Sequence, residues 1–169
     1  MASLPFTDST KNVFAESRLI ALDLGYDYIS TLHFFLADCN LYPISSSKGL
    51  FFKNEAEFEK FYSNMRVGAP TTLLGSVPLL REAEQSLKKA KQVCRSYRDE
   101  AIHPCHLLLA ASQLPASPIL NLLTIAGLTP EDLRNYYIRT GQLSPLLPAP
   151  YNTPNILSRL WQRVRPHRL

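Results

Sequence analysis

The stretch HPCH, residues 103–106, places two histidines and a cysteine within four residues, immediately before an apolar run. These residue types can ligate zinc, with Cys94 as a remote fourth ligand, or can pair a thiol nucleophile with a base. The spacing matches no zinc pattern, and neighbours such as Cys105 and His106 point to different faces of a helix. We therefore predict a capping or core histidine, no metal, no cofactor and no catalytic residue.

The histidine of this stretch has a counterpart earlier in the chain. His33 and His106 are 73 residues apart, and STLHFFLA (30–37) aligns with HPCHLLLA at that offset. Further pairs at the same offset are Ile29 and Ile102, Leu36 and Leu109, Ala37 and Ala110, Phe14 and Leu87, and Phe6 and Leu79. A repeat of this size predicts two stacked helical units that share one core, with copies at about 5–66 and 78–141.

The first copy does not keep the residues that a metal site would need. Ser30 and Leu32 stand where the second copy has His103 and Cys105. What recurs is one histidine in the first turn of a helix, where an imidazole can satisfy free backbone groups while its ring packs inward.

Helical periodicity dominates the rest of the body. Residues 8–25 show an amphipathic stripe, with Thr7 as a predicted N-cap and Gly25 just after the helix, where a positive φ carries little steric cost. Further helices are predicted in LHFFLAD, KNEAEFEKFYSNMR, LREAEQSLKKAKQVCRSYRDE, PCHLLLAASQL, SPILNLLTIAG and TPEDLRNYYIRTG. No segment shows sustained period-2 alternation, so the predicted class is all-α.

Composition and charge narrow the class of protein. The net charge of +4 arises entirely within residues 155–169, so the body has no basic field that favours nucleic acid. No apolar run approaches the roughly 20 residues of a transmembrane helix, and the first residues do not read as a signal peptide. The three cysteines are odd in number, which favours free thiols and a cytoplasmic protein.

The C-terminal segment has a separate character. Residues 142–154 are rich in proline and predict a stiff linker, and residues 155–169 predict a basic amphipathic helix. Such a short helix is marginal alone in water and needs a surface. It can dock on the body, on a partner through Trp161, Arg159 and Arg163, or, as the least favoured alternative, on a membrane surface.

These patterns resemble the Clp N-terminal (Clp repeat) domain of the Clp/Hsp100 unfoldases over about residues 5–141. The first copy matches the family pattern without a gap at Phe6, Thr7, Ala21, Leu24, Gly25, Ile29, Ser30, Thr31 and His33. The second matches at His106, Leu107, Leu108, Leu109 and 119–134. The resemblance implies a domain over 1–141, a double repeat of a four-helix unit with pseudo-twofold symmetry. Its structural residues would be Gly25, Thr31, His33, His106 and Gly127.

The resemblance also implies a function in binding other proteins. Domains of this family dock adaptors and substrates, so we expect a chaperone-associated adaptor or accessory module; the alternative is an assembly component, for example of a secretion machine, that holds a partner helix. The expected partner is a protein or peptide, for example a Clp ATPase or peptidase, or a secretion-assembly protein. The expected contact residues in the body are Phe6, Thr7, Leu32, Leu79 and Leu80.

Two departures from the family pattern limit these expectations. The family's T-E-H glutamate is replaced by Leu32 and Cys105, so phosphoarginine recognition, which needs a carboxylate partner, is not carried over. The sequence also contains no GxxxxGK[ST] loop, so ATP hydrolysis is not expected.

Overall fold

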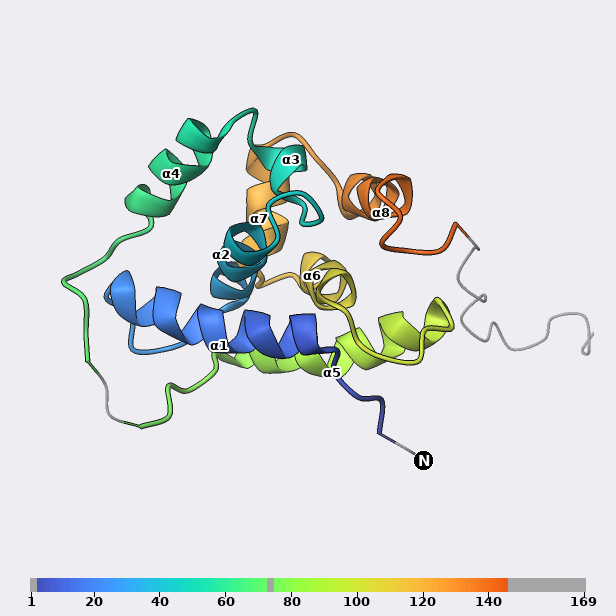
Figure 1. Ribbon diagram of the computed structural model, residues 1–169, viewed down its shortest axis with the longest axis horizontal. Helices are drawn as coiled ribbons and strands as arrows, with labels where there is room; N and C mark the ends of the chain where they lie inside the picture. The colour runs from blue at the N-terminus through green and yellow to red at the C-terminus, as the bar shows by residue number, and fades with distance from the viewer. Residues whose placement is uncertain (1–2, 73–74, 146–169) are drawn as a thin grey trace, which may run out of the picture.

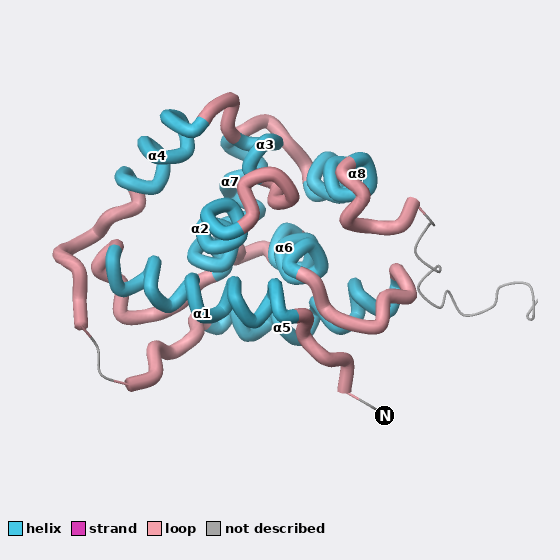
Figure 2. The backbone as a smooth tube through the Cα atoms, viewed as in Figure 1, coloured by secondary structure: helices cyan, strands magenta, loops and turns pink. Residues whose placement is uncertain are grey.

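The computed structural model describes residues 3–72 and 75–145, and within these ranges it contains helices and loops but no strand (Figures 1 and 2). The all-α prediction is confirmed. The helices are α1 (Asp8–Asp23), α2 (Thr31–Leu41), α3 (Lys48–Phe51), α4 (Glu55–Asn64), α5 (Arg81–Ser96), α6 (Pro104–Ser112), α7 (Pro118–Ile125) and α8 (Pro130–Arg139).

The two copies place equivalent helices in equivalent order. Each copy has a long first helix that packs on the apolar second helix, α1 on α2 and α5 on α6, and α2 contacts α6 between them (Figure 1). The first copy keeps all four helices, although α3 has only 4 residues where α7 has 8. The abbreviated sequence of the first copy therefore shortens one helix and removes none.

Backbone hydrogen bonds between the copies make the pseudo-twofold relation visible. Ile102 donates to the carbonyl of Pro5 (2.8 Å) and accepts from the amide of Thr7 (3.1 Å). Ile29, the counterpart of Ile102, makes the same two bonds with residues 78–80, at 2.8 Å each. The segment before the first helix of each copy is thus held by the segment before the second helix of the other copy. These bonds satisfy polar backbone groups at the centre of the fold.

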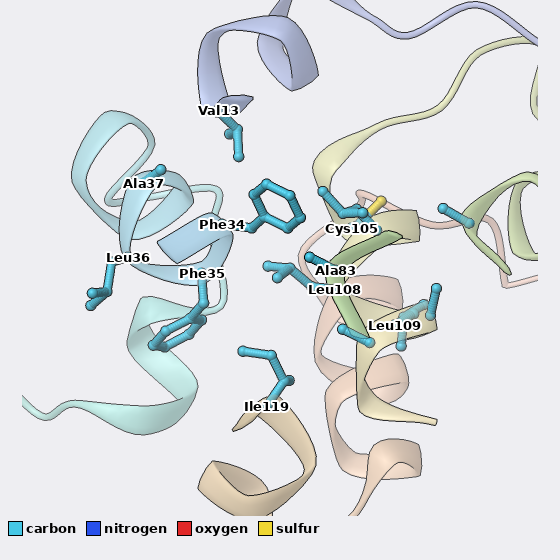
Figure 3. Packing of buried hydrophobic residues seen from close by; sticks show 14 of the residues in the cluster. Val13, Phe34, Phe35, Leu36, Ala37, Ala83, Cys105, Leu108, Leu109 and Ile119 are labelled. Atoms are coloured by element: carbon cyan, nitrogen blue, oxygen red, sulfur yellow. The ribbon is translucent and has the colours of Figure 1, made fainter. Parts of the chain in front are cut away.

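One hydrophobic core spans both copies. Phe34 and Phe35 of α2 face Leu108 of α6, with Val13 of α1 and Ile119 of α7 closing the cluster from either side (Figure 3). All five side chains are at most 1% exposed. Continuity of the core explains why neither copy forms a separate globule: each four-helix unit covers its apolar face with the other.

The loop after α4 returns to the end of α1, and a glycine permits the contact. Gly25 has φ +87°, and a Cβ on it would lie 2.8 Å from backbone atoms of Gly68. The amide of Val67 donates to the carbonyl of Leu24 (2.9 Å) beside this contact. The close approach of two backbones therefore requires glycine here.

The predicted limits of the domain, of the linker 142–154 and of the helix 155–169 remain predictions. Residues 146–169 lie outside the described residues, and with them Trp161, Arg159 and Arg163.

Candidate functional site

The recurring histidines close the first turns of α2 and α6. Nδ1 of His33 accepts from the amide of Ser30 (2.9 Å), and Nδ1 of His106 accepts from the amide of His103 (3.0 Å). Both imidazoles are fully buried. Each ring therefore takes the place that glutamate occupies in a capping box, with an apolar face left to pack inward. This geometry answers the question raised by HPCH with a structural role.

The two histidines differ in what lies beyond the cap. Nε2 of His106 lies 2.7 Å from Oδ2 of Asp99, whereas Nε2 of His33 has no hydrogen-bond partner. Tyr26, the counterpart of Asp99, instead packs edge-on against the His33 ring, with centroids 4.6 Å apart. Burial lowers the pKa of His33 to about 4. Burial also lowers the pKa of His106, although Asp99 opposes this shift.

A carboxylate from one copy caps a helix of the other. Oε1 of Glu82, in the first turn of α5, accepts from the amide of Thr31 at the start of α2 (2.8 Å). The hydroxyl of Thr31 lies 3.1 Å from that of Ser117. The equivalent of Thr31 is Pro104, which has no N–H, so the second copy needs no such acceptor. No local sequence pattern identifies Glu82 as a cap, because the amide that it accepts from lies 51 residues away in the chain.

The three cysteines are free and buried. Burial raises the pKa of Cys94 to about 11 and raises the pKa of the Cys39 and Cys105 thiols further. A thiol with a raised pKa is a poor nucleophile at neutral pH. Cys105 donates to the carbonyl of Gln142 (3.7 Å) and has no hydrogen bond to a histidine ring. Over residues 3–72 and 75–145, no group of three His, Cys, Asp or Glu side chains is placed to hold a metal ion.

We expect the native chain to resist a thiol reagent. At pH 7.5 the release of thionitrobenzoate from Ellman's reagent should be roughly 100-fold slower, or more, than from a free cysteine, because all three thiols are buried and mostly protonated. The same chain in urea should react with three equivalents. One equivalent that reacts in the native chain as fast as free cysteine would reopen the nucleophile hypothesis.

An apolar hollow of about 150 Å³ opens between α1 and α5. It is lined by Phe14, Ser17, Ile29, Phe34, Leu79 and Leu87. Ser17 contributes no free donor, since its hydroxyl bonds to the carbonyl of Phe14 (2.8 Å). We call this site the Leu79 hollow.

The pseudosymmetric position is filled by an aromatic ring. There Phe6 stands in place of Leu79 and packs edge-on against Phe14, with ring centroids 5.2 Å apart. Phe6 is larger than Leu79, so the two sides of the interface differ in size at this residue pair. They also differ at Phe34, whose counterpart is Leu107.

The expected contact residues of the body fall on both sides of the interface. Phe6 and Thr7 lie at the start of α6, where Thr7 also caps α1 by accepting from the amide of Thr10 (3.2 Å). Leu79 and Leu80 lie at the start of α2, and Leu80 is 37% exposed. Of the five, only Leu79 lines the hollow.

Three further expected residues occupy plain structural positions. Leu32 is partly buried against the core. Gly25 and Gly127 follow α1 and α7 with positive φ, the backbone conformation that glycine adopts most readily.

Known proteins share this fold at low sequence identity. No family model matches the chain, and no curated protein matches its sequence. A structure from work on a malarial protein secretion system matches at 20% identity with a TM-score of 0.63, over 85% of this chain and 99% of its own. The N-terminal domain of ClpD, a caseinolytic protease-associated chaperone of Arabidopsis thaliana, matches at 16% identity with a TM-score of 0.62, over 82% of this chain and 96% of its own. The Hsp104 N-terminal domain from Candida albicans matches at 21% identity with a TM-score of 0.63, over 82% of this chain and 93% of its own.

The chain therefore has the fold of Clp N-terminal domains, as its sequence predicted. At these identities the comparisons show the fold, and the function has to be argued from the site. No helix among residues 3–72 and 75–145 is both long and apolar enough to cross a bilayer.

Proposed function

We propose that this Clp N-terminal-like domain is a non-catalytic module that binds a segment of another protein, as an accessory or adaptor in Clp-type protein quality control. The Leu79 hollow is the observation that carries the proposal. It is an open apolar site within a fold shared with the N-terminal domains of the chaperone ClpD and of Hsp104. The cytoplasm is the proposed setting, because three free thiols suit a reducing compartment.

The dimensions of the hollow fit one apolar side chain. A cavity of about 150 Å³ lined by Leu, Ile and Phe accommodates a benzene-sized group. Removing one Leu or Phe side chain from water contributes about 1.5–3 kcal/mol, which is too little for tight binding without further contacts. The proposed ligand is therefore a peptide segment that anchors one aliphatic or aromatic residue in the hollow and lies over the neighbouring surface at Leu80.

The chemistry of the described residues supports binding rather than catalysis. His33 and His106 use Nδ1 to cap their own helices, and His106 uses Nε2 for Asp99. Nε2 of His33 has no partner, but the ring is fully buried, as is that of His106, so both imidazoles are poorly placed to take a proton from a substrate.

A structural role in an assembly is the second candidate. It is supported by the match to a structure from work on a malarial protein secretion system. The two candidates differ in the partner: an adaptor would bind a Clp ATPase, peptidase or client, whereas an assembly component would hold one stable partner.

We expect the substitution Leu79→Phe to abolish partner capture. The added ring should fill the hollow as Phe6 fills the equivalent position, without loss of stability. Affinity purification from native lysate, read by mass spectrometry, should enrich a Clp component with the parent chain and lose it with Leu79→Phe. Ile125→Phe is the matched control, because Ile125 is 85% exposed and does not line the hollow.

The outcomes separate the candidates. Enrichment of one assembly protein, again lost in Leu79→Phe, would move the function to the structural class. Equal capture by the Leu79→Phe and parent chains would contradict the hollow as the binding site. A chain of residues 1–154 tests the contact predicted for Trp161, Arg159 and Arg163, including the membrane alternative.

A further inference from the structure

A second cavity lies away from the Leu79 hollow and has a different chemistry. It has a volume of about 400 Å³ and is bounded by the start of α1, the end of α2, the start of α6 and the loop after α8. Its lining residues are Ser9, Asp38, Tyr42, Ser45, His103, Pro104, Cys105, Gly141 and Gln142. We call it the Asp38 cavity.

Asp38 is the unusual member of this lining. The residue is 3% exposed, and none of the hydrogen bonds or ion pairs among the described residues engages its carboxyl group. A largely buried carboxylate without a protein donor is unfavourable, since burial removes much of its hydration and no protein group replaces it. Burial accordingly raises the pKa of Asp38 to about 7. A ligand that donates hydrogen bonds to this carboxylate would offset the cost of its ionised form.

The lining favours a positively charged ligand. It contains one acidic residue, Asp38, one histidine, His103, and no lysine or arginine. Ser9, Tyr42 and Ser45 add hydroxyl-bearing side chains to the lining. Tyr42 already accepts from Nδ2 of Asn12 (3.3 Å), which leaves its hydroxyl oriented by a neighbour.

The start of α6 borders the same cavity, and a helix N-terminus by itself favours anions. Here two of its first positions offer no free donor: Pro104 has no N–H, and the amide of His106 donates to the carbonyl of His103 (3.1 Å). The amide of His103, just before the helix, donates to His106 (3.0 Å). The carboxylate of Asp38 is therefore the acidic group of the cavity that lacks a donor, and few backbone donors remain at this helix start.

We propose that the Asp38 cavity binds the cationic head of a basic side chain, an ammonium or guanidinium group, with the Asp38 carboxylate as its counter-ion. Two sources can present this chemistry. One is a partner polypeptide. The other is the chain itself, because Arg159, Arg163, Arg165 and Arg168 follow Gln142 closely enough to reach back to the cavity.

The test uses the full chain at pH 7.5 and N-acetyl-L-lysine methylamide as the probe. We expect the backbone amide resonances of Tyr42, Gly141 and Gln142 to shift saturably, and N-acetyl-L-norleucine methylamide, which lacks the charge, to leave them in place. Asp38→Asn should weaken binding of the lysine probe about tenfold or more, because it removes the counter-ion and keeps the shape. Asp27→Asn, at an exposed position, should not change it.

Several results would overturn the proposal. These are equal binding of the norleucine probe, undiminished affinity in Asp38→Asn, and shifts of the same amides with inorganic phosphate alone. A fourth is no shift with the lysine probe in both the parent chain and a chain with the four tail arginines changed to glutamine. Tighter probe binding in that glutamine chain would show that the C-terminal arginines normally occupy the cavity. Unchanged binding would indicate that a partner polypeptide supplies the cation. Leu79→Phe should not affect binding at the Asp38 cavity. A failure of the cation proposal is therefore distinguishable from a failure of the proposed function.

Discussion

At pH 8 the variant Asp38→Asn is expected to unfold with a free energy about 2–4 kcal/mol larger than that of the parent chain. The gain follows from linkage: a pKa raised from 3.8 to about 7 means that folding opposes ionisation of this carboxyl over roughly three pH units, at about 1.4 kcal/mol each. An asparagine keeps the shape and carries no charge, although its amide also lacks partners. At pH 4 the carboxyl is neutral in the native state, and the two chains should have similar stability.

The same variant should expose a pH dependence that the parent chain conceals. His33 has its pKa lowered by burial from 6.5 to about 4, so the unfolded chain binds more protons between these values and stability rises with pH there. Asp38 has the opposite sign: the native state binds more protons between pH 3.8 and about 7, and stability falls as pH rises. His106, with a lowered pKa, adds to the first effect, and Glu82, with a pKa raised by burial, adds to the second.

The two effects nearly cancel in the parent chain and separate in the variant. We expect a shallow profile for the parent from pH 4 to 6.5 and a rise of about 3 kcal/mol over this range for Asp38→Asn. Urea denaturation at half-unit pH intervals gives both curves, with Asp27→Asn as the exposed control. If the curves of the parent and of Asp38→Asn ran parallel, the carboxyl of Asp38 would not be the buried acid described here.

The stability argument and the binding argument concern the same carboxyl. At neutral pH the carboxyl of Asp38 lowers the free energy of unfolding, and a ligand that binds the native state can offset this loss. A cation that binds only the native state would lower the pKa of Asp38 and reduce the stability gained by Asp38→Asn. Stability measured with and without the lysine probe therefore links the two experiments.

Much of the fold was predictable because its signals are local or repeated. The caps at Thr7 and Thr129 and the positive φ of Gly25 follow from short-range patterns, and the structure shows each of them. The first-turn histidines were predictable because they recur at His33 and His106, and the structure shows both capping their helices.

The groups that the sequence did not reveal act over long distances or through packing. The sequence gives Asp99 no role beyond that of an acidic loop residue, because its contact with His106 depends on the packing of α6. Asp38 lies in the apolar stretch LHFFLADCNL, where nothing indicates whether a polar residue reaches solvent or a cavity. The Leu79 hollow lies where the repeat has Leu79 in place of Phe6, and the aligned sequence shows this difference but not the packing around Phe14.

Gly25→Ala is expected to lower the free energy of unfolding by about 3 kcal/mol. Alanine at φ +87° costs about 1–2 kcal/mol, and its Cβ would lie 2.8 Å from backbone atoms of Gly68, which cannot move aside as a flexible side chain would. Gly127→Ala is the matched control: it has φ +70° but nothing within 4 Å of the added carbon, so only the backbone term of about 1 kcal/mol should remain.

The excess loss in Gly25→Ala should have a local signature. To relieve the contact, the segment around Gly68 must move from the end of α1, and the hydrogen bond from the amide of Val67 to Leu24 (2.9 Å) is the first one at risk. Hydrogen exchange at Val67 should therefore accelerate in Gly25→Ala beyond the change expected from global stability, and should follow global stability alone in Gly127→Ala. Equal losses of stability in the two variants would show that the backbone conformation, and not the approach of Gly68, sets the requirement for glycine at this position.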